Sequence, residues 1–139
     1  MAKYWIGVAH RKQALSAKSV GFVALSHGKK SAVSKLSAGD GVIYYAPKTD
    51  FEGDAVQAVI TLATITSTEI YERNMPDTDF RPWVIDATYE EISEIPIRPI
   101  LESLSFVKDI RYWGMAFRRS QFEISEPDFH VLATAMRGQ

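Results

Sequence analysis

The chain has 139 residues, a formal net charge of −1, no cysteine and a hydrophobic fraction of 46%. This length and composition suit one globular domain over residues 1–139 and exclude a disordered, collagen-like or fibrous chain. Without cysteine, the chain cannot form disulfides, perform thiol catalysis or build a zinc site with cysteine ligands.

The N-terminus gives no sign of a targeting or membrane-spanning segment. The apolar run before His10 is about seven residues long, too short for the hydrophobic region of a signal peptide or for a membrane span. The lack of cysteine also leans toward a reducing compartment. We therefore expect a cytoplasmic protein with no membrane partner.

Charge is distributed unevenly along the chain. Residues 1–48 have eight Lys or Arg and one acid, residues 49–97 have two Arg and eleven acids, and residues 98–139 have six basic and five acidic residues. Segregated charge can steer an anion to one face even when the net charge is near zero. The alternative is that these segments mix again in space.

The first half of the chain predicts four strands and two short helices. Strands are expected at residues 3–9, 21–25, 42–46 and 56–66, where β-branched and aromatic residues gather. The length of the 56–66 run indicates a bent or bulged strand. Helices are expected at residues 11–18 and 31–36, the second with Ser31 as its N-cap.

The second half predicts shorter elements. Strands are expected at residues 69–72, as a sheet edge, at 82–89, and at 117–124 with one polar face. Residues 74–80 form an acidic loop, and residues 108–113 are irregular. A short helix is expected at residues 97–104, with Pro99 in its first turn.

The last element is a helix that packs on the core. Ser125 is its expected N-cap, with Asp128 at the third helical position in place of the usual Glu or Gln of a capping box. Apolar residues follow at helical spacing: Phe129, Leu132, Ala133 and Met136. Short strands mixed with helices, without regular βαβ alternation, favour an α+β fold. We expect a five- or six-stranded, partly closed barrel with short peripheral helices and a C-terminal helix.

The sequence offers little that could support catalysis. It contains no glycine-rich nucleotide motif, zinc-protease motif or nucleophile elbow. The three histidines lack metal-ligand spacing, and Glu90 and Glu91 point to opposite sides of an extended chain. We therefore expect no enzyme, no metal and no cofactor.

A first candidate site is His27-Gly28-Lys29, followed by Lys30. Glycine lets the backbone approach a ligand closely, and the helix that follows presents free N–H groups to an anion. The alternative for these residues alone is a surface turn with solvated lysines.

A second candidate combines Tyr44, Tyr45 and Pro47 with Trp5 and Trp83. In a strand, one tyrosine faces the core and the other faces outward, and the sequence does not say which. Flat rings of this kind can stack on a base or enclose a methylated group. The alternative is that all four rings belong to the core.

A third candidate is the segment from Tyr112 to Ser120. Arg118 and Arg119 would point to opposite faces of the expected strand. One could hold a phosphate through a bidentate contact, and the other is expected to pair with an acid from residues 49–97.

Taken in order, the motifs YWIGVA, FVALSHGK, KLSAGDGVIYY, FRPWVID, PIRPILESLSFVKD, WG and FRRSQFEI resemble the EVE-domain family. This family lies within the PUA-like superfamily, which also includes the YTH readers of methylated RNA. The resemblance runs from Tyr4 to about Met136. Two stretches depart from better-described members: Gly7–Arg11, after the first strand, and Phe22–Gly28.

The resemblance implies a PUA-like barrel with a pocket for a nucleobase, flipped out of its strand and enclosed by aromatic rings. It places the loop after the first strand and the HGK turn at the rim. Trp5, Tyr44 or Tyr45, and Trp83 become wall candidates, and Arg118, Ser120 and Gln121 become polar contacts. The residues assigned to the pocket are Trp5, His27, Gly28, Lys29, Tyr44, Tyr45, Pro47, Trp83, Arg118, Ser120 and Gln121.

The leading hypothesis is a non-catalytic, nucleic-acid-binding reader of a modified base, either methylated or hydroxymethylated. A small-molecule sensor that binds a nucleoside-like ligand, without nucleic acid, is the alternative. An enzyme ranks last. The sequence leaves open DNA or RNA, and a monomer or a weak dimer.

Overall fold

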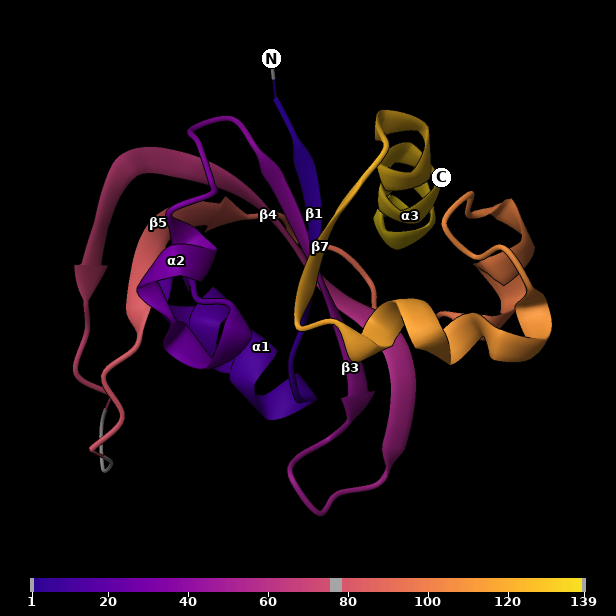
Figure 1. Ribbon diagram of the computed structural model, residues 1–139, viewed down its shortest axis with the longest axis horizontal. Coiled ribbons are helices and arrows are strands. Elements are labelled where there is room, and N and C mark those ends of the chain that lie inside the picture. Colours follow the sequence, from indigo (N-terminus) through magenta and orange to yellow (C-terminus); the bar gives the residue numbers. More distant parts are fainter. Residues whose placement is uncertain (1, 76–78, 139) are drawn as a thin grey trace.

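The computed structural model describes residues 2–75 and 79–138, which form one mixed sheet between two layers of helices (Figure 1). The sheet has seven strands in the order β2-β5-β4-β3-β1-β7, and β6 pairs with β4. The strands are β1 (Tyr4–Val8), β2 (Phe22–Val23), β3 (Gly41–Lys48), β4 (Ala55–Glu72), β5 (Trp83–Tyr89), β6 (Ile95–Pro96) and β7 (Gln121–Ile124). β1 and β3 pair in parallel, and the other pairs are antiparallel.

Helices cover both faces of this sheet. The α-helices are α1 (Arg11–Val20), α2 (Lys30–Val33) and α3 (Glu126–Arg137), and the 3₁₀ helices are η1 (Ser26–Gly28), η2 (Arg98–Ser103) and η3 (Ile110–Arg118). α1 and α2 lie on one side of the sheet, and α3 lies on the other (Figure 1). None of the helices in the described residues is long and apolar enough to cross a bilayer.

The sheet curls but does not close. Within the described residues, no strand ladder joins β2 to β7, the two ends of the sheet. Side chains bridge part of this gap: Ser26 Oγ donates to Gln121 Oε1 at 2.8 Å, and Gln121 Nε2 donates to the carbonyl of Ala32 at 3.3 Å. The predicted α+β fold with a partly closed mixed sheet is confirmed. The strand count exceeds the predicted five or six because the two-residue strand β6 was not expected.

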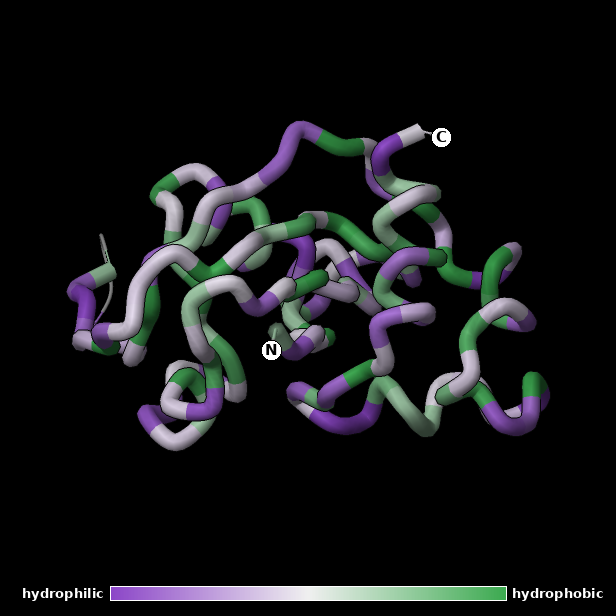
Figure 2. The backbone as a smooth tube through the Cα atoms, turned by 90° about the horizontal axis from the view of Figure 1, so that it is seen from above, coloured by the Kyte–Doolittle hydropathy of each residue, from purple (hydrophilic) through white to green (hydrophobic). Residues whose placement is uncertain are grey.

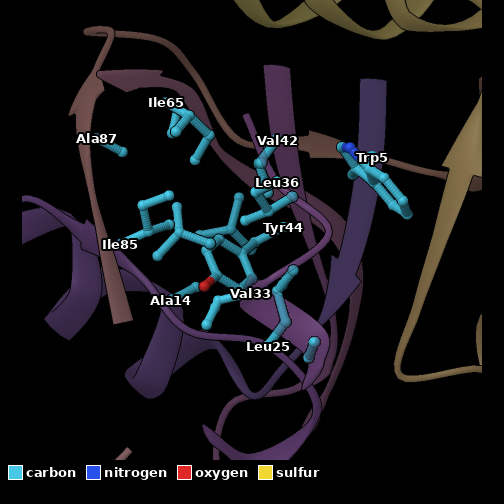
Figure 3. Packing of buried hydrophobic residues seen from close by; sticks show 14 of the residues in the cluster. Trp5, Ala14, Leu25, Val33, Leu36, Val42, Tyr44, Ile65, Ile85 and Ala87 are labelled. Atoms are coloured by element: carbon cyan, nitrogen blue, oxygen red, sulfur yellow. The ribbon is translucent and has the colours of Figure 1, made fainter. Parts of the chain in front are cut away.

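Both faces of the sheet are buried, so the molecule has two main cores. One core lies between the sheet and α1 and α2, and it contains Tyr44, Val33 and Ile85 (Figure 3). The other contains Tyr45 and Leu132 and lies against η2, η3 and α3. Apolar stretches run through the middle of the molecule, and many outer turns are hydrophilic (Figure 2).

The two tyrosines of β3 show what this double burial does. Tyr44 and Tyr45 do point to opposite faces, but they are only 2% and 3% exposed. The prediction that one of them faces outward is wrong because the second face is covered as well. Tyr45 stacks on Phe117 with ring centroids 4.1 Å apart, and burial raises the pKa of Tyr45 to about 12.

The longest predicted strand is bent, as expected. β4 runs for 18 residues, its register against β3 and β5 shifts, and Gln57 has a positive φ of 50°. The separate edge strand predicted at residues 69–72 is wrong, because these residues continue β4 and pair with β5. The predicted loop at residues 74–80 lies partly outside the described residues.

Two local predictions also fail at element ends. Ser31 is not an N-cap, because α2 already begins at Lys30, directly after the η1 turn. The strand predicted at 117–124 begins only at Gln121, and residues 110–118 form η3 instead of an irregular segment and a strand. Asp109 accepts a hydrogen bond from the backbone N–H of Arg111, which starts η3.

The C-terminal helix forms as predicted. Ser125 Oγ accepts a hydrogen bond from the backbone N–H of Asp128 at 3.3 Å. The carboxylate of Asp128 does not return to Ser125, since it accepts from Ser105 N and Oγ at 2.9 and 2.6 Å. The four apolar residues at helical spacing are all buried.

A paired carboxylate joins this helix to the end of β5. Arg137 donates to both oxygens of Glu90, at 2.9 and 2.7 Å, and lowers the pKa of that carboxyl from its ordinary value of 4.5. Glu90→Gln should therefore cost up to about 1 kcal/mol at pH 7, because the pair is partly exposed. The difference should vanish as the pH falls through the lowered pKa, where Glu90 becomes neutral in both states.

Urea unfolding at pH 7 and pH 3 measures this difference. Glu123→Gln, at an exposed position of β7, is the matched control. An equal deficit of the Glu90→Gln variant at both pH values would contradict the assignment.

Candidate functional site

A cleft of about 1100 Å³ opens beside the C-terminal end of β1. In the part of the chain that the structure describes, its wall comes from the end of β1, α1 and the segment from β2 to η1. The loop between β3 and β4, the segment before β5 and the turn between η3 and β7 complete the wall. The cleft thus gathers segments that are far apart in the sequence.

The η1 turn is the most unusual part of this wall. Ser26, His27 and Gly28 have consecutive positive φ values of 49°, 60° and 81°. This conformation is unfavourable for residues with a side chain, so the surrounding structure must hold it. Ser26 Oγ shares a hydrogen bond of 2.6 Å with Ser120 Oγ and donates to Gln121, which fixes the turn against the start of β7. Retained backbone strain of this kind is typical of functional sites.

Position 28 requires glycine because a side chain there would collide with Pro82. A Cβ atom there would lie 2.6 Å from Cβ and 2.7 Å from Cα of Pro82. The absent side chain lets the η1 turn pack directly on the segment before β5, which brings Phe80 to the cleft wall.

Aromatic side chains line the cleft from several elements. Tyr44 lies in the wall, whereas Phe51 and Phe80 are 76% and 44% exposed. The ring of His10 contacts the edge of Phe51 at a centroid distance of 6.4 Å. His10 Nδ1 is buried and has no hydrogen-bond partner within the described residues, which is uncommon for a buried polar atom. The cleft therefore offers flat apolar surface, and it lies beside a buried nitrogen atom that has no partner among the described residues.

The cleft is also cationic. Among the described residues, Lys12, Arg118 and Arg119 line it, and Asp50 is the one carboxylate. Lys12 Nζ is 3.9 Å from Asp50, and both side chains are mostly exposed, so this contact is weak. Such a balance attracts an anion to the cleft.

The two arginines differ from the prediction. They lie at the end of η3 and at its C-cap, so they do not alternate along a strand. Neither forms an ion pair with a carboxylate of residues 2–75 or 79–138, so the expected partner from residues 49–97 is wrong for the described acids. The Arg119 guanidinium instead lies over the ring of Phe122, 4.3 Å from its centroid. Neither guanidinium is therefore neutralised by a described carboxylate.

The structure brings together about half of the residues that the sequence suggested for the pocket. The cleft lining includes His27, Gly28, Tyr44, Pro47, Arg118 and Ser120. The lining among described residues does not include Trp5, Lys29, Tyr45, Trp83 or Gln121. Gln121 nevertheless lies directly behind the η1 turn, through its bond to Ser26.

The tryptophans lie elsewhere for identifiable reasons. Trp5 belongs to the N-terminal half of β1, away from the end where the cleft opens. It is buried, and its Nε1 donates to Asp40 at 3.3 Å. Trp83 packs partly against the core, with Lys30 Nζ 4.8 Å from its ring centroid. Lys29 is exposed at the N-cap of α2.

Sequence reasoning missed several residues of the cleft. Lys12 and Ser16 come from α1, and Phe51 comes from the loop after β3. His10 was not named, although it lies in the loop after β1 that the resemblance placed at the rim. Two signals were present: the polar face of α1 directly follows a strand end, and Phe51 is a lone aromatic ring in a polar loop. In residues 2–75 and 79–138, no three His, Asp or Glu side chains gather as a metal site requires.

Tyr44 holds the cleft wall to the sheet. Its hydroxyl donates to the carbonyl of Ala24 at 2.5 Å and accepts from the N–H of Ala24 at 3.1 Å, and burial raises its pKa well above the ordinary range. Tyr44→Phe should destabilise the fold by about 1–3 kcal/mol, because two backbone groups lose this partner.

Tyr71→Phe provides the comparison for this prediction, since its hydroxyl binds Asp86 at 2.6 Å on the surface. Its loss should cost less than about 1 kcal/mol. Equal urea-unfolding midpoints for wild type and Tyr44→Phe would refute the bracing role of Tyr44.

Comparison with known proteins adds the following. A family model for the EVE domain matches residues 3–135. The chain is 35% identical over 134 residues to the UPF0310 protein YdcG of Bacillus subtilis (strain 168), covering 96% of this chain and 91% of YdcG. It is 33% identical to the UPF0310 protein msl3206 of Mesorhizobium japonicum, covering 98% and 93% of the two chains.

Among solved structures, the fold is similar to the YTH domain of Zygosaccharomyces rouxii MRB1 in complex with N6-methyladenosine RNA. The TM-score is 0.69 at 9% identity, covering 99% of this chain and 88% of that one. The YTH domain-containing protein mmi1, solved as an RNA complex, gives a TM-score of 0.64 at 14% identity, covering 97% and 81%. At these identities the likeness concerns the fold.

Proposed function

Since the chain belongs to the EVE-domain family, we propose that it binds nucleic acid and reads a modified base that is flipped into the cleft. The modification would be a methyl or hydroxymethyl group. The observation that carries this proposal is the cleft itself, with its aromatic wall and its cationic lining. Two YTH domains of the same fold were solved with RNA, which supports a nucleic-acid ligand.

The proposal assigns roles from the geometry. His27 and Phe51 provide ring surface for the base, because stacking on aromatic side chains accepts any base, and the buried Tyr44 supports the wall. Lys12 and Arg118 contact phosphates. Gly28, Pro47 and Ser120 complete the wall, and Gln121 positions the η1 turn from behind.

We propose binding without catalysis. The hydroxyls of Ser26 and Ser120 bind each other, and Ser26 also donates to Gln121, whereas within the described residues no histidine is hydrogen-bonded to either hydroxyl. A serine nucleophile would need such a base.

The alternative is a free nucleoside-like ligand without nucleic acid. One observation favours it: a cleft of about 1100 Å³ can enclose a whole drug-sized molecule. It differs from the main proposal in one measurable respect, since a free nucleoside needs no chain of phosphates.

Binding to matched oligonucleotides distinguishes these functions. Single-stranded and duplex DNA and RNA probes, each with and without a modified base, are titrated at two salt concentrations. We expect tighter binding of one modified probe and an affinity that falls with salt, because phosphate contacts release counterions. Absence of binding to every probe at low salt would sink the proposal, and binding of free nucleosides alone would establish the alternative.

Charge variants test the assigned phosphate contacts. Lys12→Ala and Arg118→Ala should each weaken binding to all probes about equally and reduce the slope of log affinity against log salt by about one. Lys35→Ala is the control, because Lys35 is exposed and does not line the cleft. A salt slope that changes as much in Lys35→Ala as in the cleft variants would argue against a phosphate path along this wall.

A further inference from the structure

A second cavity, of about 370 Å³, is lined by η3 and the segment that leads into it. Its wall is rich in apolar surface, with Phe106, Tyr112, Trp113 and Met115. Tyr112 is 60% exposed and Met115 is 59% exposed. Large apolar side chains exposed together in this way are typical of a binding surface.

Arg119 connects this cavity to the cleft, because it lines both. Its guanidinium lies over the ring of Phe122, 4.3 Å from the ring centroid. The two hollows therefore share one wall residue.

The surface around the second cavity is cationic. Residues 98–119 carry five Lys or Arg and two acids. One of these acids, Asp109, is paired with Arg111 at 2.9 Å. Lys108 and Asp109 line the second cavity and Arg118 lines the cleft, so each of the two linings holds a cation besides Arg119. This combination of rings and positive charge suits a nucleotide better than an aliphatic peptide.

Resting on the proposed function, we propose that the second cavity binds the base next to the flipped one in the same strand. Arg119 contacts the phosphate between the two bases, and the neighbouring base stacks on Tyr112 and Trp113. Two cavities that share Arg119 as a wall residue suit two consecutive nucleotides of one strand. Because a base in the second cavity has also left any partner strand, the ligand is single-stranded on this side of the flipped base.

Nuclear magnetic resonance of the ¹⁵N-labelled protein tests this directly. The probes are nucleoside monophosphates and single-stranded trinucleotides, as DNA and as RNA, each with and without a methylated or hydroxymethylated base. The amide of Gly28 reports on the cleft and the indole N–H of Trp113 reports on the second cavity. The indole of Trp5, bound to Asp40 in the core, is the internal control.

We expect the monophosphates to shift Gly28 alone and the trinucleotides to shift Gly28 and Trp113. Trinucleotides that shift Gly28 and leave Trp113 unchanged would overturn the second site while the cleft function stands. No shift at either reporter with any probe would overturn both proposals.

Substitutions give a second readout. Tyr112→Ala should weaken trinucleotide binding about tenfold and leave monophosphate binding unchanged, since one stacking surface is lost. Ile110→Ala is the control, because Ile110 is exposed on the same 3₁₀ helix but does not line the cavity. Equal trinucleotide affinities for wild type and Tyr112→Ala would overturn the assignment.

Discussion

The parallel pairing of β1 with β3 determines the path of the chain over the sheet and therefore the position of the cleft. Parallel neighbours cannot be joined by a hairpin, so the chain must cross one face of the sheet between them. That crossover contains α1, β2, η1 and α2, and it covers the Tyr44 face (Figure 1). The cleft opens where the crossover leaves β1, and the η1 turn within it is held by Ser26 against the start of β7.

Folding changes which charged residues lie near one another. Much of the basic first third is offset by acids of the middle segment: Arg11 binds Glu94 at 2.7 Å, and Lys18 lies 3.8 Å from Glu91. The cations that line the cleft come partly from the far end of the chain, at Arg118 and Arg119. The attraction for an anion is therefore a property of the assembled cleft and not of the N-terminal segment alone.

Local patterns were enough to predict the main strands and the C-terminal helix, because alternation, β-branched runs and the Ser125 cap act between neighbours in sequence. Local patterns failed where segments that are distant in the sequence determine burial or secondary structure. One of Tyr44 and Tyr45 was expected outside, but Tyr45 is buried as well because its helical cover comes from residues 98–137. Arg118 was expected in a strand, whereas η3 extends to it. The family resemblance placed the loop after the first strand and the HGK turn at the rim of a pocket, and His10, His27 and Gly28 of these segments line the cleft, whereas Phe51 reaches it only through the folded arrangement of loops.

A crystal structure of the protein with a single-stranded oligonucleotide that carries its preferred modified base would test the central claim most directly. The account predicts the modified base inside the cleft, against His27 and Phe51, with a neighbouring phosphate at Arg118. A bound strand whose modified base remains stacked on its neighbours outside the cleft would contradict it.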